Sequence, residues 1–318
     1  MLARRTSVIC PIIFFCCILL ASCGGSAAPS AAATPRASPT RIATPTSTPV
    51  PTATSTTGLA PQHYNSRVFY RGSARPDDLA FDQEGRLLFG DFYNGTISQV
   101  NSDGTVTVIA RGLAGPEGFT VLSNGTMIIA EQRRHRIVSL APGATSPTVL
   151  RALPGTPSTA RCKDGVDGTA YDATTNTLIV PDSPTGAVYR MSLDGRTLTL
   201  LTSGMVRPVG GVVDAQGNMY IADECGGEVW KIAPGGKVQR FGGFSMPDDV
   251  ALDAYGNLFV IDLDPAIHAL IRLNLATGQR ETLASRGYIE PQGLVIDQHG
   301  NIFVSDDFAN IIVEYMPA

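Results

Sequence analysis

The chain has 318 residues, of which 43% are hydrophobic and 7% aromatic, so it can bury a sizeable core as one large domain or two ordinary ones. It carries 24 basic and 28 acidic residues, and four of the basic residues, but no acid, lie in the first 60 positions. The acidic balance of the remainder argues against a nucleic-acid partner.

Residues 1–22 have the pattern of a bacterial lipoprotein signal peptide. Arg4 and Arg5 precede an apolar run at 8–20, and small residues then lead to Cys23. The run is shorter than the roughly twenty residues that span a bilayer. We therefore predict export, cleavage before Cys23 and lipidation of its thiol, which anchors the protein to the bacterial membrane on the periplasmic or cell-surface side. A retained transmembrane anchor is the alternative.

Residues 23–61 are almost wholly Ser, Thr, Ala, Pro and Gly. Such a segment contains too little apolar surface to offset the entropic cost of ordering its backbone. We predict a disordered tether that joins the membrane anchor to a folded domain at 62–318.

Six similar copies occupy the folded domain. Five of them begin with a turn of the type Pro-X-Gly or Pro-X-Asp that leads into an apolar strand, and the third begins with the similar Val166-Asp167-Gly168. The copies start at residues 76, 116, 166, 208, 247 and 291. A tight turn with Gly or Asn, a second strand, a third strand and a weaker fourth strand follow. The interval between starts, 39 to 50 residues, is typical of four-stranded propeller blades. The sequence therefore predicts an all-β, six-bladed β-propeller.

The last copy stops at its third strand, 311–315, and so lacks an outer strand. The segment 66–71 precedes the first copy as the segment 236–241, the outer strand of the fourth copy, precedes the fifth, and the two segments are similar in sequence. We predict that this N-terminal strand completes the sixth blade and closes the ring. A closed ring leaves no long unpaired strand edge, and we expect a monomer.

Acidic residues gather where the strands meet one face of the ring. The second strand ends at an acid in every copy, and a role repeated in every blade is architectural, so we predict that these carboxylates accept hydrogen bonds from neighbouring turns. They are Asp91, Glu131, Asp182, Asp223, Asp262 and Asp306.

The corresponding positions at the starts of the inner strands vary between blades, which indicates a site at the channel mouth. They are Asp77, Glu117, Asp167, Val209, Asp248 and Gln292. Converging carboxylates repel one another unless they are protonated or neutralised. We predict either a divalent metal, with Ca²⁺ expected, on Asp77, Glu117, Asp167 and Asp248, or raised pKa values; a solvated acidic funnel without an ion is the alternative.

The blade sequences "MPDDVALDAYGNLFVID" and "EPQGLVIDQHGNIFVSD" resemble those of the gluconolactonase, senescence marker protein and luciferin-regenerating enzyme group, and also NHL-repeat propellers. The resemblance covers 64–318. It implies a divalent metal in the channel, with Asp77 and Asp248 as ligands and Asp248 also as the base. The Asn that the family has in a middle blade is replaced by Val209, which offers no oxygen ligand. Glu117 and Asp167 are the candidate substitutes.

Two histidines, His135 and His268, lie between second and third strands and are expected on the acidic rim. A histidine there can act as general base on an ester or lactone. An exposed loop histidine without a catalytic role is the alternative.

Cys162 and Cys225 are the two thiols of the folded domain, and the topology predicts that they lie on the same rim in adjacent blades. Outside the cytoplasm such a pair oxidises if the Cα atoms come within about 7 Å. We predict a disulfide, with two free thiols as the alternative.

Two functions remain open from the sequence. The first is an exported binding module whose acidic mouth recognises a small molecule or an extracytoplasmic protein, and Val209 favours this interpretation. The second is a metal-dependent hydrolase of lactones or esters in which Asp248 is the base.

Overall fold

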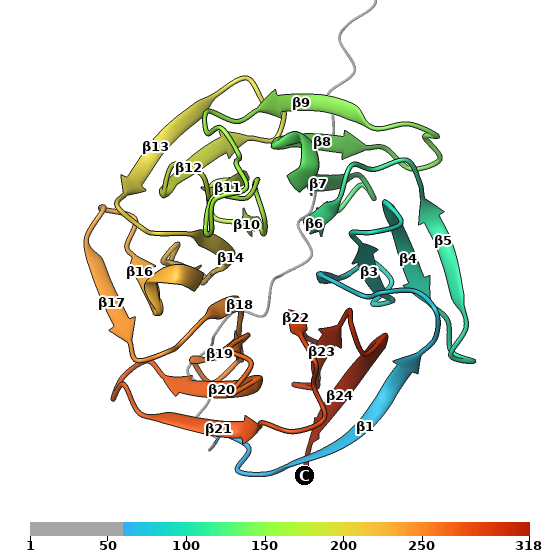
Figure 1. The fold of residues 1–318 in the computed structure, drawn as a ribbon, viewed down its shortest axis with the longest axis vertical. Coiled ribbons are helices and arrows are strands. Elements are labelled where there is room, and N and C mark those ends of the chain that lie inside the picture. The colour runs from blue at the N-terminus through green and yellow to red at the C-terminus, as the bar shows by residue number, and fades with distance from the viewer. Residues whose placement is uncertain (1–59) are drawn as a thin grey trace, which may run out of the picture. The chain divides into compact units, whose positions relative to one another are not determined.

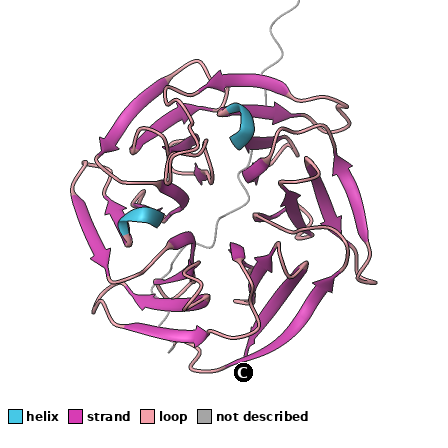
Figure 2. Ribbon diagram, in the orientation of Figure 1, coloured by secondary structure: helices cyan, strands magenta, loops and turns pink. Residues whose placement is uncertain are grey.

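The computed structural model describes residues 60–318, which form 24 strands in six four-stranded antiparallel sheets arranged around an axis (Figure 1). The predicted six-bladed propeller is thereby confirmed. The helices of this part are two single turns, η1 (Gln132–Arg134) and η2 (Glu224–Gly226) (Figure 2). Within residues 60–318 no helix is long and apolar enough to cross a membrane. The predicted signal peptide, Cys23 and nearly all of the tether lie outside the described residues.

The strands of each blade run in chain order from the axis outward. In blades one to three they are β2 (Leu79–Phe81), β3 (Leu87–Asp91), β4 (Thr96–Val100), β5 (Val106–Ala110), β6 (Pro116–Val121), β7 (Met127–Glu131), β8 (Arg136–Leu140), β9 (Thr148–Ala152), β10 (Ala170–Asp172), β11 (Thr177–Asp182), β12 (Ala187–Ser192) and β13 (Leu198–Ser203). In blades four to six they are β14 (Pro208–Val213), β15 (Met219–Asp223), β16 (Glu228–Ile232), β17 (Val238–Gly242), β18 (Pro247–Leu252), β19 (Asn257–Asp262), β20 (Ala269–Asn274), β21 (Arg280–Ala284), β22 (Pro291–Ile296), β23 (Ile302–Asp306) and β24 (Ile311–Pro317), with β1 (Tyr64–Arg71) outermost in blade six.

The hydrophobic core lies between neighbouring blades. Second strands such as β15 and β23 are buried along their whole length, because each blade is covered on both faces by its neighbours. Ile179 of blade three and Ile221 of blade four, for example, are fully buried in one apolar cluster. This is why the second strands are continuous apolar runs, whereas the outer strands include exposed residues.

The predicted closing strand is confirmed. β1 pairs with β24 in antiparallel register from Tyr64 opposite Pro317 to Arg71 opposite Ile311, so the strand begins two residues earlier than predicted (Figure 1). Tyr70 of β1 also packs against Phe89 of blade one, with ring centroids 5.6 Å apart. The strand therefore joins the last blade to the first.

The inner strands crowd together at the axis. A Cβ atom on Gly118 would lie 2.5 Å from the Cα of Gly168, and one on Gly168 would lie 2.8 Å from the Cα of Gly210. Only glycine fits such a close backbone approach, which explains the glycine in the repeated Pro-X-Gly turn.

Blades one and five have Asp78 and Asp249 at this glycine position. The Asp78 carboxylate accepts a hydrogen bond from the Phe119 N–H of blade two at 3.0 Å, and that of Asp249 accepts one from the Leu294 N–H of blade six at 2.7 Å. These two acids thus connect neighbouring blades just inside the channel mouth.

Candidate functional site

The acids that end the second strands fasten the loops of the channel face. Asp262 accepts hydrogen bonds from the backbone N–H groups of Ser245 (2.8 Å) and Met246 (3.0 Å), which precede the inner strand of the same blade. Equivalent bonds are made by Asp91, Glu131, Asp182, Asp223 and Asp306. The predicted architectural role is confirmed, and these six carboxylates are unavailable to a ligand.

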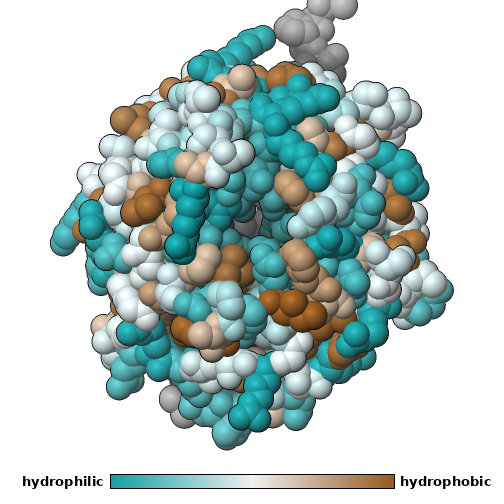
Figure 3. Space-filling model, in the orientation of Figure 1, coloured by the Kyte–Doolittle hydropathy of each residue, from teal (hydrophilic) through white to brown (hydrophobic). Residues whose placement is uncertain are grey.

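A cavity of about 680 Å³ opens at the mouth of the channel, and we call it the mouth cavity. Figure 3 shows the hollow at the centre of this face. The four acids predicted as a site all line it, and they are Asp77, Glu117, Asp167 and Asp248. The structure therefore brings together side chains from blades one, two, three and five.

Burial raises the pKa of these acids. Asp77 and Glu117 are 7% and 9% exposed, and for each the loss of hydration is the largest cause of a pKa well above the ordinary range. The two carboxyl groups also hydrogen-bond each other, which lowers the pKa of Asp77 and raises that of Glu117. The nearby charge of Asp167 raises both further.

Asp248 is the most isolated of the four acids. Its side chain is in a residue only 8% exposed, yet no hydrogen bond or ion pair to its carboxylate occurs among residues 60–318. Its pKa is well above the ordinary range, first because of burial and then because of the charge of Asp167, while Arg207 lowers it. A buried carboxylate without a partner faces the cavity, where a ligand can reach it.

Val209 does not point into the channel, so that expectation is wrong. Its side chain is fully buried and packs in an apolar cluster with residues such as Tyr220 and Val260. Blade four instead contributes Arg207, two positions earlier, to the lining of the mouth cavity. The fourth blade therefore adds a positive charge where the other blades add negative ones.

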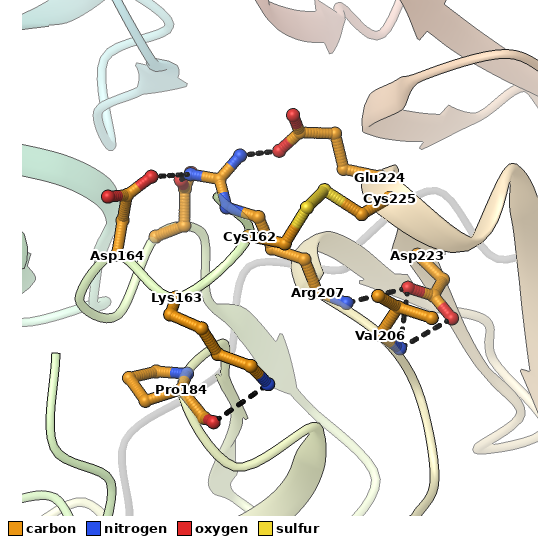
Figure 4. Close-up of a disulfide and its surroundings, with 10 residues drawn as sticks. Cys162, Lys163, Asp164, Pro184, Val206, Arg207, Asp223, Glu224 and Cys225 are labelled. Atoms are coloured by element: carbon orange, nitrogen blue, oxygen red, sulfur yellow. Dashed lines mark hydrogen bonds and ion pairs between the residues drawn. A yellow bond between two sulfur atoms is a disulfide. The ribbon is translucent and has the colours of Figure 1, made fainter. Parts of the chain in front are cut away.

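Arg207 is held by three carboxylates, and Figure 4 shows two of them, Asp164 and Glu224. Its Nη2 lies 2.9 Å from Oδ2 of Asp167 and 3.5 Å from Oδ2 of Asp164, and its Nη1 pairs with Glu224. Burial raises the pKa of Asp167, and the guanidinium partly offsets that rise. Sequence reasoning missed Arg207, although Arg75 has the same place before the first proline turn and also lies near the mouth.

The predicted disulfide between Cys162 and Cys225 is confirmed, with Cα atoms 6.2 Å apart. Figure 4 shows it beside Arg207. Cys162 is two residues from Asp164, and Cys225 follows Glu224 directly. The bridge therefore ties together the loops that carry two of the carboxylates around the guanidinium.

The two predicted histidines are placed differently. His268 lines the mouth cavity. The His135 ring is buried away from it, where Nδ1 accepts a hydrogen bond from the Val166 N–H at 2.9 Å and Nε2 lies 3.5 Å from Oδ1 of Asp182. His268 therefore lies near the acids of the cavity, whereas His135 contributes to the packing between blades two and three.

Part of the lining of the mouth cavity is apolar. Phe92, Tyr93 and Ile289 are part of the lining, and Ile289 is 56% exposed. The Arg75 guanidinium lies 3.5 Å from the Tyr93 ring centroid and pairs with Asp307 at 3.0 Å. Figure 3 shows hydrophobic surface beside the central hollow. We call Phe92, Tyr93 and Ile289 the apolar wall. Sequence reasoning missed it because these residues come from two loops that are far apart in the sequence.

The divalent metal implied by the family resemblance can be compared with these residues. Oxygen ligands of the kind that Ca²⁺ prefers are present. However, no group of three or more His, Cys, Asp or Glu within the described range is arranged to hold a metal ion. Val209 has no oxygen ligand, and the Asp167 carboxylate already forms an ion pair with Arg207. The residues therefore do not fit a preformed divalent site.

Comparison with solved structures shows the same fold in proteins of low sequence identity. A gluconolactonase from Xanthomonas campestris matches with 16% identity and a TM-score of 0.64 over 80% of this chain and 90% of that one. A virginiamycin B lyase from Staphylococcus aureus matches with 17% identity and a TM-score of 0.60 over 77% of this chain and 81% of that one. No curated protein sequence matches this chain.

A family model gives the relationship directly. The model described as "SMP-30/Gluconolactonase/LRE-like region" matches residues 78–261, which is more than half of the chain and includes Asp167, Arg207 and Asp248. The chain belongs to the SMP-30/gluconolactonase/LRE-like family.

Proposed function

We propose that this protein is an exported, lipid-anchored module that binds a small molecule in the mouth cavity. The observation that carries the proposal is the Asp248 carboxylate, which is buried, lacks a partner among the described residues and faces the cavity. A poorly hydrated carboxylate without a protein partner destabilises the folded state, so its presence is better explained by a ligand than by stability.

The shape of the site supports a small molecule. The volume of about 680 Å³ lies within the range of small-molecule pockets, roughly 300 to 1,000 Å³. The disulfide and the strand-end acids hold the surrounding loops, so the cavity is largely formed before a ligand arrives. A preformed site loses less conformational entropy on binding.

Export and anchoring rest on the sequence before Cys23 and agree with the disulfide. A bridge between Cys162 and Cys225 is typical of proteins in an oxidising compartment. The lipid on Cys23 would keep the propeller at the bacterial membrane, with the Ser/Thr/Pro/Ala-rich segment as spacer.

Hydrolysis of a lactone or ester is the second candidate, and membership of the gluconolactonase-like family favours it. Asp248, with its raised pKa, would accept the proton of the attacking water. The sequence-based expectation of Ca²⁺ is tested in the same experiment.

The test compares the full chain with Asp248→Asn and with Glu84→Gln, which removes one exposed charge that is not part of the cavity lining. Saturation-transfer NMR with a small-molecule library, a thermal shift with CaCl₂ and a pH-stat assay with glucono-δ-lactone are the three measurements. We expect library compounds that bind the wild type and Glu84→Gln but not Asp248→Asn.

If the wild type hydrolyses the lactone and Asp248→Asn does not, the protein is a hydrolase and the proposal of a binding module is wrong. A thermal shift with CaCl₂ that Asp248→Asn abolishes would restore the metal. Binding of library compounds that is equal in all three proteins would overturn the assignment of the mouth cavity as the ligand site.

A further inference from the structure

We propose that the ligand of the mouth cavity is an organic cation that carries a flat apolar group. This inference rests on the proposed binding function and names its ligand class. Three features of the mouth cavity point to it, namely the charge of its floor, the guanidinium already seated there and the apolar wall on one side.

The lining of the cavity holds more acidic than basic residues, although Arg161 and Arg207 are both part of it. Asp167 is paired with Arg207, and Asp307 at the rim is paired with Arg75. Asp77 and Glu117 have only each other, and Asp248 has no hydrogen bond or ion pair within residues 60–318. Burial raises the pKa of Asp77, Glu117 and Asp248, and a cation beside them would favour their ionised form, so a positive ligand group gains most at this point.

The Arg207 guanidinium is an organic cation bound by the walls of the same cavity. It lies against Asp167 and Asp164 and pairs with Glu224, from loops of blades three and four. Three carboxylates of the mouth thus already surround one planar nitrogen group. They are not spaced to converge on a single ion, since no described group of three is arranged for a metal.

The apolar wall gives the ligand its second property. Phe92 and Tyr93 meet edge to face with ring centroids 5.2 Å apart, and Ile289 is 56% exposed in the lining of the same cavity. The Arg75 and Arg133 guanidinium groups lie over the Tyr93 and Phe92 rings, 3.5 Å and 4.3 Å from the ring centroids. A metal ion or a simple ammonium ion would leave the rest of this apolar surface, including Ile289, uncovered. A flat hydrocarbon group on the cation would cover it, and each Å² of apolar surface removed from water contributes about 25 cal/mol.

The size of the cavity agrees with such a ligand. About 680 Å³ is far more than one hydrated ion needs and suits a molecule with a charged end at the floor and an apolar body at the rim. The charged end would lie near Asp248, and the apolar body near Ile289.

The test uses the full chain and three matched probes, which are 2-phenylethylamine, its neutral analogue 2-phenylethanol and ethylamine, which lacks the ring. Calorimetry is done at low salt with the wild type, Asp248→Asn, Ile289→Ser and the charge control Glu84→Gln. We expect 2-phenylethylamine to bind at least tenfold more tightly than either other probe. Asp248→Asn should lose at least tenfold for the amine, while Glu84→Gln should match the wild type.

Ile289→Ser separates the apolar contribution from the charge. It should weaken binding of 2-phenylethylamine several-fold and leave binding of ethylamine unchanged. An unaltered or higher thermal midpoint of both variants shows that they are folded.

Equal binding of 2-phenylethanol and 2-phenylethylamine, or full binding of the amine to Asp248→Asn, overturns the proposed ligand class. If the class fails while some neutral compound binds in an Asp248-dependent way, the binding function stands and only its ligand was wrong. If neither these probes nor the library bind, both proposals fall.

Discussion

The Arg207 guanidinium lies 2.9 Å from the Asp167 carboxylate and neutralises one of the four acids of the mouth cavity. Arg207→Met should destabilise the protein by about 3 kcal/mol, because it leaves the buried Glu224 without its cation. Urea unfolding measures this loss. Arg196→Met removes an exposed guanidinium beside Asp194 and should cost less than about 1 kcal/mol. Equal losses in the two variants would contradict the role of Arg207.

Asp262 and Asp248 should respond to substitution in opposite ways. Asp262→Ala leaves the Ser245 and Met246 N–H groups without their acceptor and should cost about 1–3 kcal/mol. Asp248→Asn removes a buried charge without a described partner, so the thermal midpoint at pH 7.5 should stay the same or rise. A large loss of stability in Asp248→Asn would show that Asp248 is architectural and would remove the basis of the proposed site.

Stability should fall as the pH rises from about 5 to 7.5. Asp78 and Asp307 have pKa values raised from 3.8 to about 7, in both cases first by burial. Between these values the folded state binds more protons than the unfolded state, so raising the pH destabilises the folded state. The thermal midpoint should therefore be higher at pH 5 than at pH 7.5.

Asp307→Asn provides the control for this pH dependence. It removes one of the groups with a raised pKa and should make the dependence between pH 5 and 7.5 shallower. If the thermal midpoint of the wild type instead increases with pH over this range, the folded state does not bind more protons than the unfolded state. That result would contradict the raised pKa values of Asp78 and Asp307.

The closing strand should be critical to the ring. Tyr70→Ala removes a buried ring that packs on Phe89 and whose hydroxyl accepts a hydrogen bond from the Ala74 N–H, and it should cost about 3–5 kcal/mol. Tyr255→Ala, on an exposed turn, is the matched control and should change little. Chemical denaturation of both variants gives the comparison, and similar midpoints would contradict closure through β1.

The disulfide should stabilise the folded state by closing a loop of 63 residues. Loop-closure entropy predicts a loss of about 4 kcal/mol for the double variant Cys162→Ala/Cys225→Ala. The wild type should lose a comparable amount when reductant is added, whereas the double variant should not respond. Insensitivity of the wild type to reductant, with free thiols by mass analysis, would mean that the bridge does not form.

Much of the fold was predictable because it depends on local sequence patterns that repeat along the chain. The turn at Pro247 recurs at Pro291, and each is followed by alternating apolar residues, so the period and the strands could be counted. The closing strand was predictable because the last copy visibly lacks an outer strand. The disulfide followed from topology, which places Cys162 and Cys225 on the same face.

The site was predictable only in part. The acids Asp77 and Asp248 were found because equivalent positions in six copies can be compared. The roles of Val209 and His135 were misjudged, since both side chains turn into the packing between blades instead of toward the channel. Periodicity tells which residues share a position in the repeat, but not how neighbouring blades pack around them.

The sequence by itself determined the number of blades, their closure and the excess of acids at one face, because each depends on residue types at regular spacing. Only the tertiary structure decided that Arg207 neutralises Asp167 and that Asp248 is left without a partner among the described residues. These relationships join residues from different blades, and they depend on side-chain directions that are set by packing around the axis.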